Sequence, residues 1–327
     1  MCTALSITTG DHYFGRTLDY ETSFGERVTV TPRNYPFPFR HTETAEHHYA
    51  MIGMTAGEKI SCGFPLYYDG VNEKGLGIAG LNFVGNAVYR DAAPTKTNLC
   101  HFEFIPWILG TCASVREVLD AVDELNITNT PLSDTVPPAQ LHWLIADREG
   151  AVAVESVADG LMVYDDPVGV LTNNPPFPMQ MQGLNDLINL SPREPENRFS
   201  AKYPLSAYSR GMGAIGLPGD VSSGSRFRKA AFLKLNSLSG EGEADCVGQF
   251  FHILGGVEMV RGSCILENGE PDITLYTSCC NASRGIYYYT TYGNRQITAV
   301  DMHNVDLDGT EPVHYPLLTE QSIFKQN

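Results

Sequence analysis

The sequence predicts an α+β fold in which helices pack outside β-sheets. β-rich runs fill the first part of the chain, helical patterns are concentrated in the middle, and β-rich runs return in the last third. These elements lack the regular strand–helix alternation of a parallel α/β sheet. Because there is no internal repeat, low-complexity tract or linker-like composition, we expect residues 1–327 to form a single domain.

The first half of the chain contains the clearest hairpin. A turn at residues 10–11 joins β-rich runs over 3–8 and 13–18. A helical block is predicted over 101–125, where Ser114 and Glu117 have the spacing of a capping box. The apolar face of that block is formed by Val115, Val118, Leu119, Val122 and Leu125. Further strands are predicted over 28–31, 65–69 and 77–83.

The second half begins with another hairpin, formed by 141–146 and 152–157 around an Asp-Arg-Glu-Gly turn. We expect the short runs 162–164 and 168–172 to continue its sheet. Residues 191–224 are rich in Pro, Gly and Ser, which predicts a mostly irregular segment. Helices are predicted over 179–190, 226–236 and 245–254, and strands over 273–278, 285–291 and 296–301.

Composition excludes several classes of function. A net charge of −16 and a pI near 4.9 argue against nucleic acid, whose phosphates require a basic surface. We expect no membrane span, because no stretch approaches the roughly 20 apolar residues that one needs. The N-terminus lacks the basic and apolar regions of a signal peptide, which predicts a cytoplasmic protein. No cysteine or histidine cluster has zinc spacing, so we expect neither a metal nor a cofactor.

Cys2 is the most conspicuous candidate nucleophile. Initiator methionine is normally removed when a small residue follows it, and removal of Met1 would give Cys2 both a thiol and a free α-amine. α-Amines and thiols in general exchange protons near neutral pH. The amine can therefore act as the base that activates its own thiol, whereas an internal cysteine would need a separate base.

The predicted hairpin brings charged residues to this end of the strand. A two-residue turn at 10–11 places Cys2 opposite Asp19. It also places Leu5 opposite Arg16. Asp19 would then hold the protonated α-amine and Arg16 would favour the thiolate. The alternative is a plain ion pair between Arg16 and Asp19, and a slip of one residue would change every partner.

The opening Met-Cys-Thr-Ala and the Phe-Gly-Arg-Thr-Leu-Asp at 14–19 resemble the choloylglycine hydrolase family, which contains bile salt hydrolases and penicillin V acylases. The resemblance continues in the same order through 72–77, 79–83, 141–147, 169–173, 216–220, 225–227, 250–254, 276–279 and 285–292. It implies an N-terminal-nucleophile fold with four αββα layers. The catalytic residues that it implies are Cys2, Arg16, Asp19, Asn82, Asn173 and Arg226.

These residues form a chemically consistent set. Cys2 would attack an amide carbonyl, and Asn82 and Asn173 would donate hydrogen bonds to the developing oxyanion. Arg16 and Arg226 would supply positive charge beside the sulfur. The resemblance thus favours the catalytic interpretation of Arg16 and Asp19 over a plain ion pair. A non-catalytic binding protein with the same fold is the alternative, which the intact set of catalytic positions disfavours.

The family also suggests a substrate. Bile salt hydrolases usually have Asn at the position of Asn82, where penicillin V acylases more often have Tyr, so we expect Asn82 to contact conjugated bile salts. Penicillin V is the alternative substrate. The Ser-Arg-Gly at 209–211 resembles taurine-preferring variants, so Arg210 is expected to contact the taurine sulfonate; its alternative role is a solvated loop cation. The resemblance further implies a homotetramer.

Overall fold

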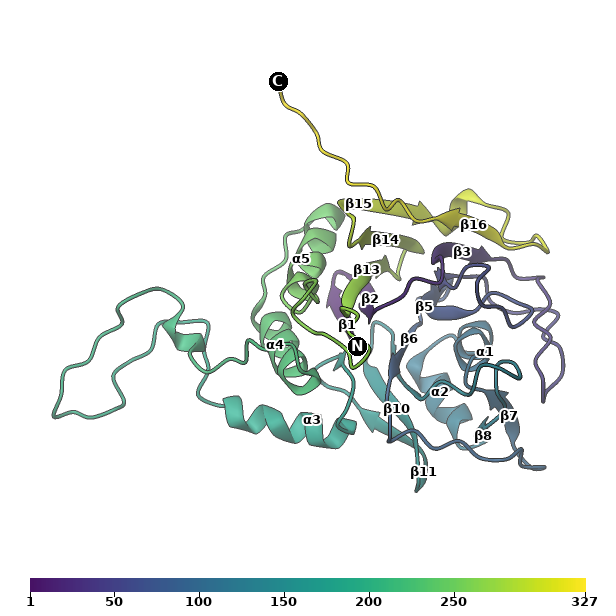
Figure 1. The fold of residues 1–327 in the computed structure, drawn as a ribbon, viewed down its shortest axis with the longest axis horizontal. Helices are drawn as coiled ribbons and strands as arrows, with labels where there is room; N and C mark the ends of the chain where they lie inside the picture. Colours follow the sequence, from purple (N-terminus) through teal and green to yellow (C-terminus); the bar gives the residue numbers. More distant parts are fainter.

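Two large antiparallel sheets stack face to face in the computed structural model, which describes residues 1–327 (Figure 1). The six-stranded sheet has the order β12 (Val170–Leu171), β1 (Cys2–Thr9), β2 (Asp11–Tyr20), β13 (Ile273–Asn281), β14 (Ile286–Thr291) and β15 (Asn294–Asp301). The eight-stranded sheet has the order β11 (Gly160–Asp165), β10 (Ala151–Val157), β9 (Leu141–Ala146), β6 (Gly77–Asn82), β5 (Tyr67–Asn72), β4 (Met51–Thr55), β3 (Arg27–Thr31) and β16 (Val313–Pro316). A separate parallel pair consists of β7 (Thr97–Cys100) and β8 (Leu125–Thr128).

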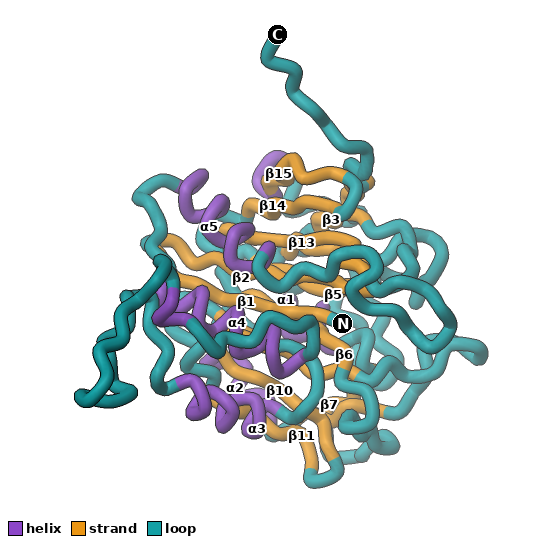
Figure 2. Tube along the Cα trace, turned by 60° about the vertical axis from the view of Figure 1, so that its left-hand side comes forward, coloured by secondary structure: helices purple, strands orange, loops and turns teal.

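Helices cover the two outer faces of this sandwich (Figures 1 and 2). The eight-stranded sheet is covered by α1 (Phe104–Thr111), which contacts β5 and β6, and by α2 (Val115–Val122). The six-stranded sheet is covered by α4 (Ser223–Asn236) and α5 (Glu243–Gly255), both of which contact β1, and α3 (Phe177–Gly183) packs on α4. No helix combines the length and apolar composition that crossing a bilayer requires. The αββα layers confirm the predicted fold class.

Burial on both faces explains why the central strands have continuous apolar sequences. Ala79 belongs to the hydrophobic cluster that fills the space between the sheets and reaches α4 and α5. Ile78, its neighbour in β6, belongs to the second cluster, under α1 and α2. Adjacent residues of a strand point to opposite faces. Each residue of such a strand therefore enters one of the two cores.

The register of the first hairpin differs from the prediction by one residue. Cys2 pairs with Leu18 and not with Asp19, and Arg16 pairs with Ala4. The ladder closes at Thr9 and Asp11, which leaves Gly10 alone at the tip with φ of 86°. A two-residue turn was therefore the wrong assumption, since glycine tolerates this positive φ and lets a shorter connection close the ladder.

Other segments also depart from the prediction. Residues 168–172 do not continue the second hairpin: β12 joins β1 in the other sheet. The block over 101–125 is two short helices, because Ser114 starts a new helix by accepting a hydrogen bond from the Glu117 N–H, and Leu125 begins β8. Leu119 is 46% exposed and lies outside the buried face. The helix expected over 179–190 is α3 followed by a 3₁₀ turn at Leu184–Leu187.

Candidate active site

A cavity of 260 Å³ opens at the N-terminal end of β1. Its polar lining includes Cys2, Arg16, Asp19 and Asn82. Most of the remaining wall is apolar and includes Phe24, Ile60, Leu66, Phe102, Ile105, Leu132, Val136 and Leu141. This arrangement suits a ligand with a large apolar body and a reactive polar group at one end.

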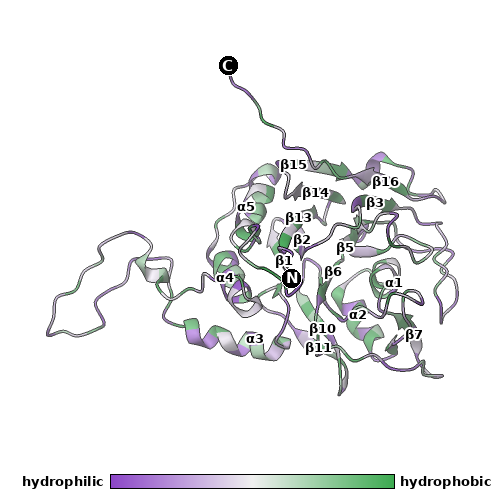
Figure 3. Cartoon of the chain, viewed as in Figure 1, coloured by the Kyte–Doolittle hydropathy of each residue, from purple (hydrophilic) through white to green (hydrophobic).

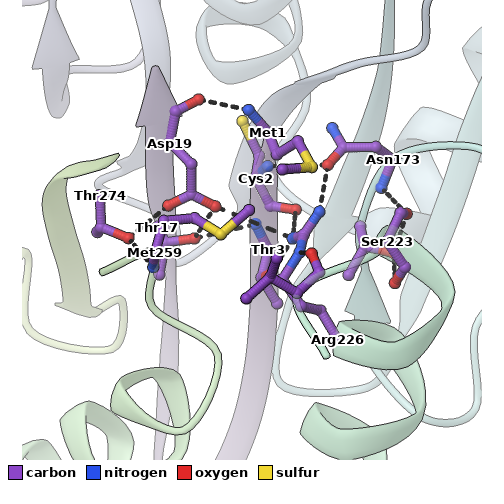
Figure 4. A network of polar contacts seen from close by, with 12 residues as sticks. Met1, Cys2, Thr3, Thr17, Asp19, Asn173, Ser223, Arg226, Met259 and Thr274 are labelled. Atoms are coloured by element: carbon purple, nitrogen blue, oxygen red, sulfur yellow. Dashed lines mark hydrogen bonds and ion pairs between the residues drawn. The ribbon is translucent and has the colours of Figure 1, made fainter. Parts of the chain in front are cut away.

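Cys2 is held by its backbone rather than by its thiol (Figure 4). Its peptide N–H donates to Asn173 Oδ1 at 2.9 Å, and its carbonyl accepts from Arg226 Nη1 at 2.5 Å. Met1 extends the ladder: its carbonyl accepts from the Asp19 N–H at 2.8 Å. The Met1 ammonium donates to the Asp19 carbonyl at 2.5 Å and pairs with Asp272 Oδ2 at 3.2 Å. Hydrogen bonds therefore hold both the N–H and the carbonyl of Cys2.

Asn173 joins three segments of the site. Its Oδ1 accepts from the Cys2 N–H and from Arg226 Nη2, the latter at 2.7 Å. Its Nδ2 donates to the Asn82 carbonyl at 2.9 Å, which leaves one amide hydrogen without a partner in the protein. The Asn82 side-chain amide makes no hydrogen bond within the protein and lines the cavity. Both amides can therefore still donate to a ligand oxygen.

Arg16 brings positive charge to the cavity. The side chain is buried, and it donates from Nε to the Thr17 carbonyl at 3.1 Å and from Nη1 to the Gly80 carbonyl. Its Nη2 has no partner. Burial alone would lower the pKa of Arg16, but neighbouring groups that are negative when ionised, first Cys2 and then Tyr276 and Asp69, outweigh burial and raise it.

Asp69 is a component of the site that sequence reasoning missed. This buried carboxylate accepts from the Tyr276 hydroxyl at 2.5 Å and from the Tyr287 hydroxyl at 2.6 Å. Burial raises the pKa of Asp69, and the Arg16 charge opposes that shift. The only sequence signal was an aspartate inside an apolar run. Its partners lie on distant strands, so the sequence alone does not reveal them.

Asp19 and Arg226 make no hydrogen bond to the Cys2 sulfur, although Asp19 lines the same cavity as Cys2. The Asp19 carboxylate accepts from Thr274 Oγ1 at 2.6 Å, and its Oδ2 is 4.0 Å from Arg226 Nη1. Burial raises the pKa of Asp19, against the lowering effect of Arg226. Asp19 and Arg16 form no ion pair within 4.0 Å, so the structure does not support the plain-ion-pair alternative.

Comparison with known proteins shows which family the chain belongs to. Residues 2–315 match the sequence model of the linear amide C–N hydrolases, choloylglycine hydrolase family. This chain belongs to the choloylglycine hydrolase family. It is 51% identical to the bile salt hydrolase/transferase of Lactiplantibacillus plantarum over 327 residues, covering 100% of both chains. Its enzymatic class is accordingly that of an amide C–N hydrolase.

Solved structures agree with this assignment. A cysteine-to-alanine variant of the conjugated bile acid hydrolase from Clostridium perfringens superposes with a TM-score of 0.91 at 38% identity, covering 100% of both chains. A penicillin V acylase from Agrobacterium tumefaciens has a TM-score of 0.74 at 17% identity, covering 96% of this chain and 90% of that one. The match to the conjugated bile acid hydrolase confirms the predicted N-terminal-nucleophile fold, and the second likeness agrees with it in fold alone.

Arg210 is the one predicted site residue that lies away from the others. It is exposed on an arm, residues 191–222, that projects from the body between α3 and α4 (Figure 1). It does not line the cavity of its own chain. The sequence pattern that suggested a substrate contact therefore lies far from Cys2 within this chain.

His101 makes the cavity wall sensitive to acid. Its Nε2 accepts from the Ala139 N–H at 3.2 Å, which requires an unprotonated nitrogen. Burial, and then the Arg40 charge, lower the pKa of His101 from 6.5 to about 4. A lowered folded-state pKa contributes stability that is present above pH 6.5 and lost as pH falls through about 4.

We therefore expect His101→Gln to reduce acid destabilisation. The glutamine Oε1 can accept from the Ala139 N–H, and an amide does not titrate in this range. Between pH 6.5 and 4 the wild type should lose about 1–3 kcal/mol more unfolding free energy than the variant. Urea denaturation at several pH values measures this difference. Parallel stability curves for the two proteins would show that His101 does not titrate on unfolding.

Proposed function

We propose that this chain hydrolyses the amide bond of glycine- or taurine-conjugated bile salts, with Cys2 as the nucleophile. The observation that carries the proposal is the apolar cavity that ends at Cys2, Arg16 and Asn82. A steroid is a large apolar body with an amide at the end of its side chain, and this cavity offers the matching arrangement. Relatives that are 51% and 39% identical have names that state activity on bile salts.

The reaction begins with the removal of Met1, which turns the Cys2 peptide nitrogen into an α-amine. The amine takes the thiol proton, and the thiolate attacks the amide carbonyl. The second Nδ2 hydrogen of Asn173 and the Asn82 amide donate to the oxyanion, and one such donor is worth roughly 3–4 kcal/mol. The α-ammonium then protonates the departing amine as the C–N bond breaks. Water cleaves the resulting thioester and returns the proton to sulfur.

In this scheme the two arginines have different roles. Arg16 lines the cavity, and its charge interacts with that of the Cys2 thiolate. Arg226 donates to the Cys2 carbonyl and to Asn173, so we assign it the alignment of these groups. Asp19 anchors the strand beside the nucleophile and interacts with the Arg226 charge.

Three substrates separate the proposal from its alternatives. Purified protein is incubated with glycocholate, taurocholate and penicillin V, and the released glycine, taurine or 6-aminopenicillanic acid is quantified. We expect a higher kcat/KM for at least one conjugated bile salt than for penicillin V. Faster cleavage of penicillin V would identify a penicillin V acylase. Binding of bile salts without turnover in protein that lacks Met1 would identify the non-catalytic alternative.

Arg210 is proposed to influence the choice of conjugate. Because it lies outside the cavity of its own chain, any contact with substrate would be made across an assembly of several copies. We expect taurocholate to be cleaved at least as efficiently as glycocholate. Arg210→Ala should then lower kcat/KM more for taurocholate, whose sulfonate extends farther than the glycine carboxylate. Equal losses for the two substrates would identify Arg210 as a solvated loop cation.

We further propose a homotetramer in which the arm, residues 191–222, is covered by another copy. The arm carries hydrophobic and hydrophilic residues (Figure 3), and Phe199 and Tyr208 are 82% and 85% exposed. Side chains of this size are normally covered by an interface when they gather on one segment. Sedimentation analysis should give four times the 35.9 kDa chain mass. Phe199→Asp with Tyr208→Asp should lower that mass, and a monomeric wild type would contradict the proposal.

We also place the protein in the cytoplasm. All eight cysteines are free thiols in the structure. Reduced cysteines are typical of proteins that work where glutathione and thioredoxin keep thiols reduced. Fractionation of the source cells with an antibody against this chain would test the location.

A further inference from the structure

A buried histidine–glutamate pair lies outside the cavity and has no role in the chemistry described above. His142 in β9 and Glu155 in β10 are directly opposite in the ladder, and both side chains are 0% exposed. His142 Nδ1 is 3.1 Å from Glu155 Oε1. Phe83 stacks on the imidazole with ring centroids 4.3 Å apart. Burying two ionisable groups is costly, which makes the contacts of this pair informative.

The pair contacts both ends of the loop that carries Asn173. His142 Nε2 is 2.8 Å from the Thr172 carbonyl, immediately before Asn173. Glu155 Oε1 accepts from the Phe177 N–H at 2.9 Å, where α3 begins. Residues 173–176 are thus bracketed by two hydrogen bonds from one pair of side chains. The strands β9 and β10 supply a rigid base for both contacts.

Hydrogen-bond chemistry assigns the protons. A carbonyl oxygen only accepts, so His142 Nε2 must carry a hydrogen and donate to Thr172. Nδ1 and Glu155 Oε1 then share one further proton, and the pair is neutral as a unit whichever atom holds it. In either arrangement Nε2 keeps its hydrogen and donates to the Thr172 carbonyl. Glu155 Oε2 has no partner, so the carboxylate interacts through Oε1 alone.

We propose that His142 and Glu155 are positioning residues, which hold the Thr172 carbonyl and the Phe177 amide so that Asn173 stays aligned with Cys2. Asn173 is the acceptor for the Cys2 nitrogen and still has a free amide hydrogen. Displacing it would disturb both the α-amine and the oxyanion donor. The inference rests on the proposed function, in which Cys2 and Asn173 carry out amide hydrolysis.

Two conservative variants test the two nitrogens of the His142 imidazole separately. The amide nitrogen of His142→Gln reaches the place of Nε2 and keeps the donor to Thr172. The amide of His142→Asn reaches only the place of Nδ1 and loses that donor. We expect His142→Asn to lower kcat about 10- to 100-fold, the scale of a displaced catalytic group. KM should stay within about threefold, because the apolar cavity wall is unchanged, and His142→Gln should recover most of kcat.

A second readout does not depend on turnover. Iodoacetamide reacts with the thiolate form of Cys2, which the α-ammonium of the same residue stabilises. The pH dependence of labelling therefore reports how readily that thiolate forms. His142→Asn should shift this profile to higher pH, because the ammonium loses its aligned acceptor. His142→Gln should leave it near the wild-type profile. Thermal unfolding of each variant identifies any loss of activity that comes from misfolding, and the labelling comparison uses only folded protein.

The outcomes separate the two proposals. A wild type that cleaves neither conjugated bile salts nor penicillin V refutes the proposed function, and the labelling profiles then decide the positioning role alone. An active wild type with equal kcat and equal labelling profiles in His142→Asn overturns the positioning role. Equal loss of kcat in His142→Asn and His142→Gln, with both folded, also overturns it, because the hydrogen bond to Thr172 would then be irrelevant.

Discussion

Replacement of Cys2 by alanine is expected to reduce amide hydrolysis to less than about a hundredth of the wild-type rate, on the scale of a lost nucleophile. The thiol provides the attacking atom, and nothing else at the cavity floor can form the thioester. The fold should survive, because Cys2 is held through its backbone. Its N–H donates to Asn173 and its carbonyl accepts from Arg226, and alanine retains both contacts. Release of glycine or taurine measures the rate.

Cys62→Ala is the matched control for loss of a thiol. Cys62 does not line the cavity, and burial raises its pKa to about 11, so it is a poor nucleophile at neutral pH. This variant should hydrolyse the substrate at the wild-type rate and still be labelled at Cys2. Turnover in Cys2→Ala above about a hundredth of wild type, or comparable loss in Cys62→Ala, would rule out Cys2 as the nucleophile.

The sequence predicted the layers of the fold better than the details of its strands. Runs such as β6, which is apolar up to Asn82 at its end and enters two cores, are easy to recognise. Strands β7 and β8 were missed because they are short and include polar residues. The hairpin register failed for a local reason. Whether Gly10 alone or a two-residue turn closes the ladder depends on a backbone conformation that the composition leaves open.

The same limit applies to the site. The family resemblance identified Cys2, Arg16, Asn82 and Asn173, and the structure brings them together from separate strands and a loop. Their contacts were not predictable. Arg226 donates to the Cys2 carbonyl and not to its sulfur. Such contacts depend on the distance and direction between remote segments, which no local pattern encodes.

Retention of any residue before Cys2 is expected to abolish hydrolysis even though the thiol is present. With Met1 in place the Cys2 nitrogen belongs to a peptide bond, and an amide nitrogen cannot accept the thiol proton. Met1 is also held firmly, since its carbonyl and ammonium both bind Asp19. Figure 4 shows the Met1 side chain beside Cys2 and Asn173, next to the groups that we assign to the reaction.

A cleavable leader tests this requirement within one preparation. The leader is joined directly to Cys2 through a protease site that leaves Cys2 as the first residue, and intact mass verifies each form. We expect cleavage to raise kcat at least about 100-fold, the scale of a missing catalytic base. A Cys2→Ala protein carrying the same leader should stay inactive after cleavage.

Equal activity before and after cleavage would contradict an α-amine base and require another group to take the thiol proton. His142 is a poor substitute, because its Nε2 donates to the Thr172 carbonyl and its Nδ1 faces Glu155 in a fully buried pair. Asp19 is also a weaker candidate, because its carboxylate accepts hydrogen bonds from Thr274 and Thr17 and makes none with Cys2. Removal of Met1 instead gives Cys2 an α-amine, which is a base on the same residue as the thiol.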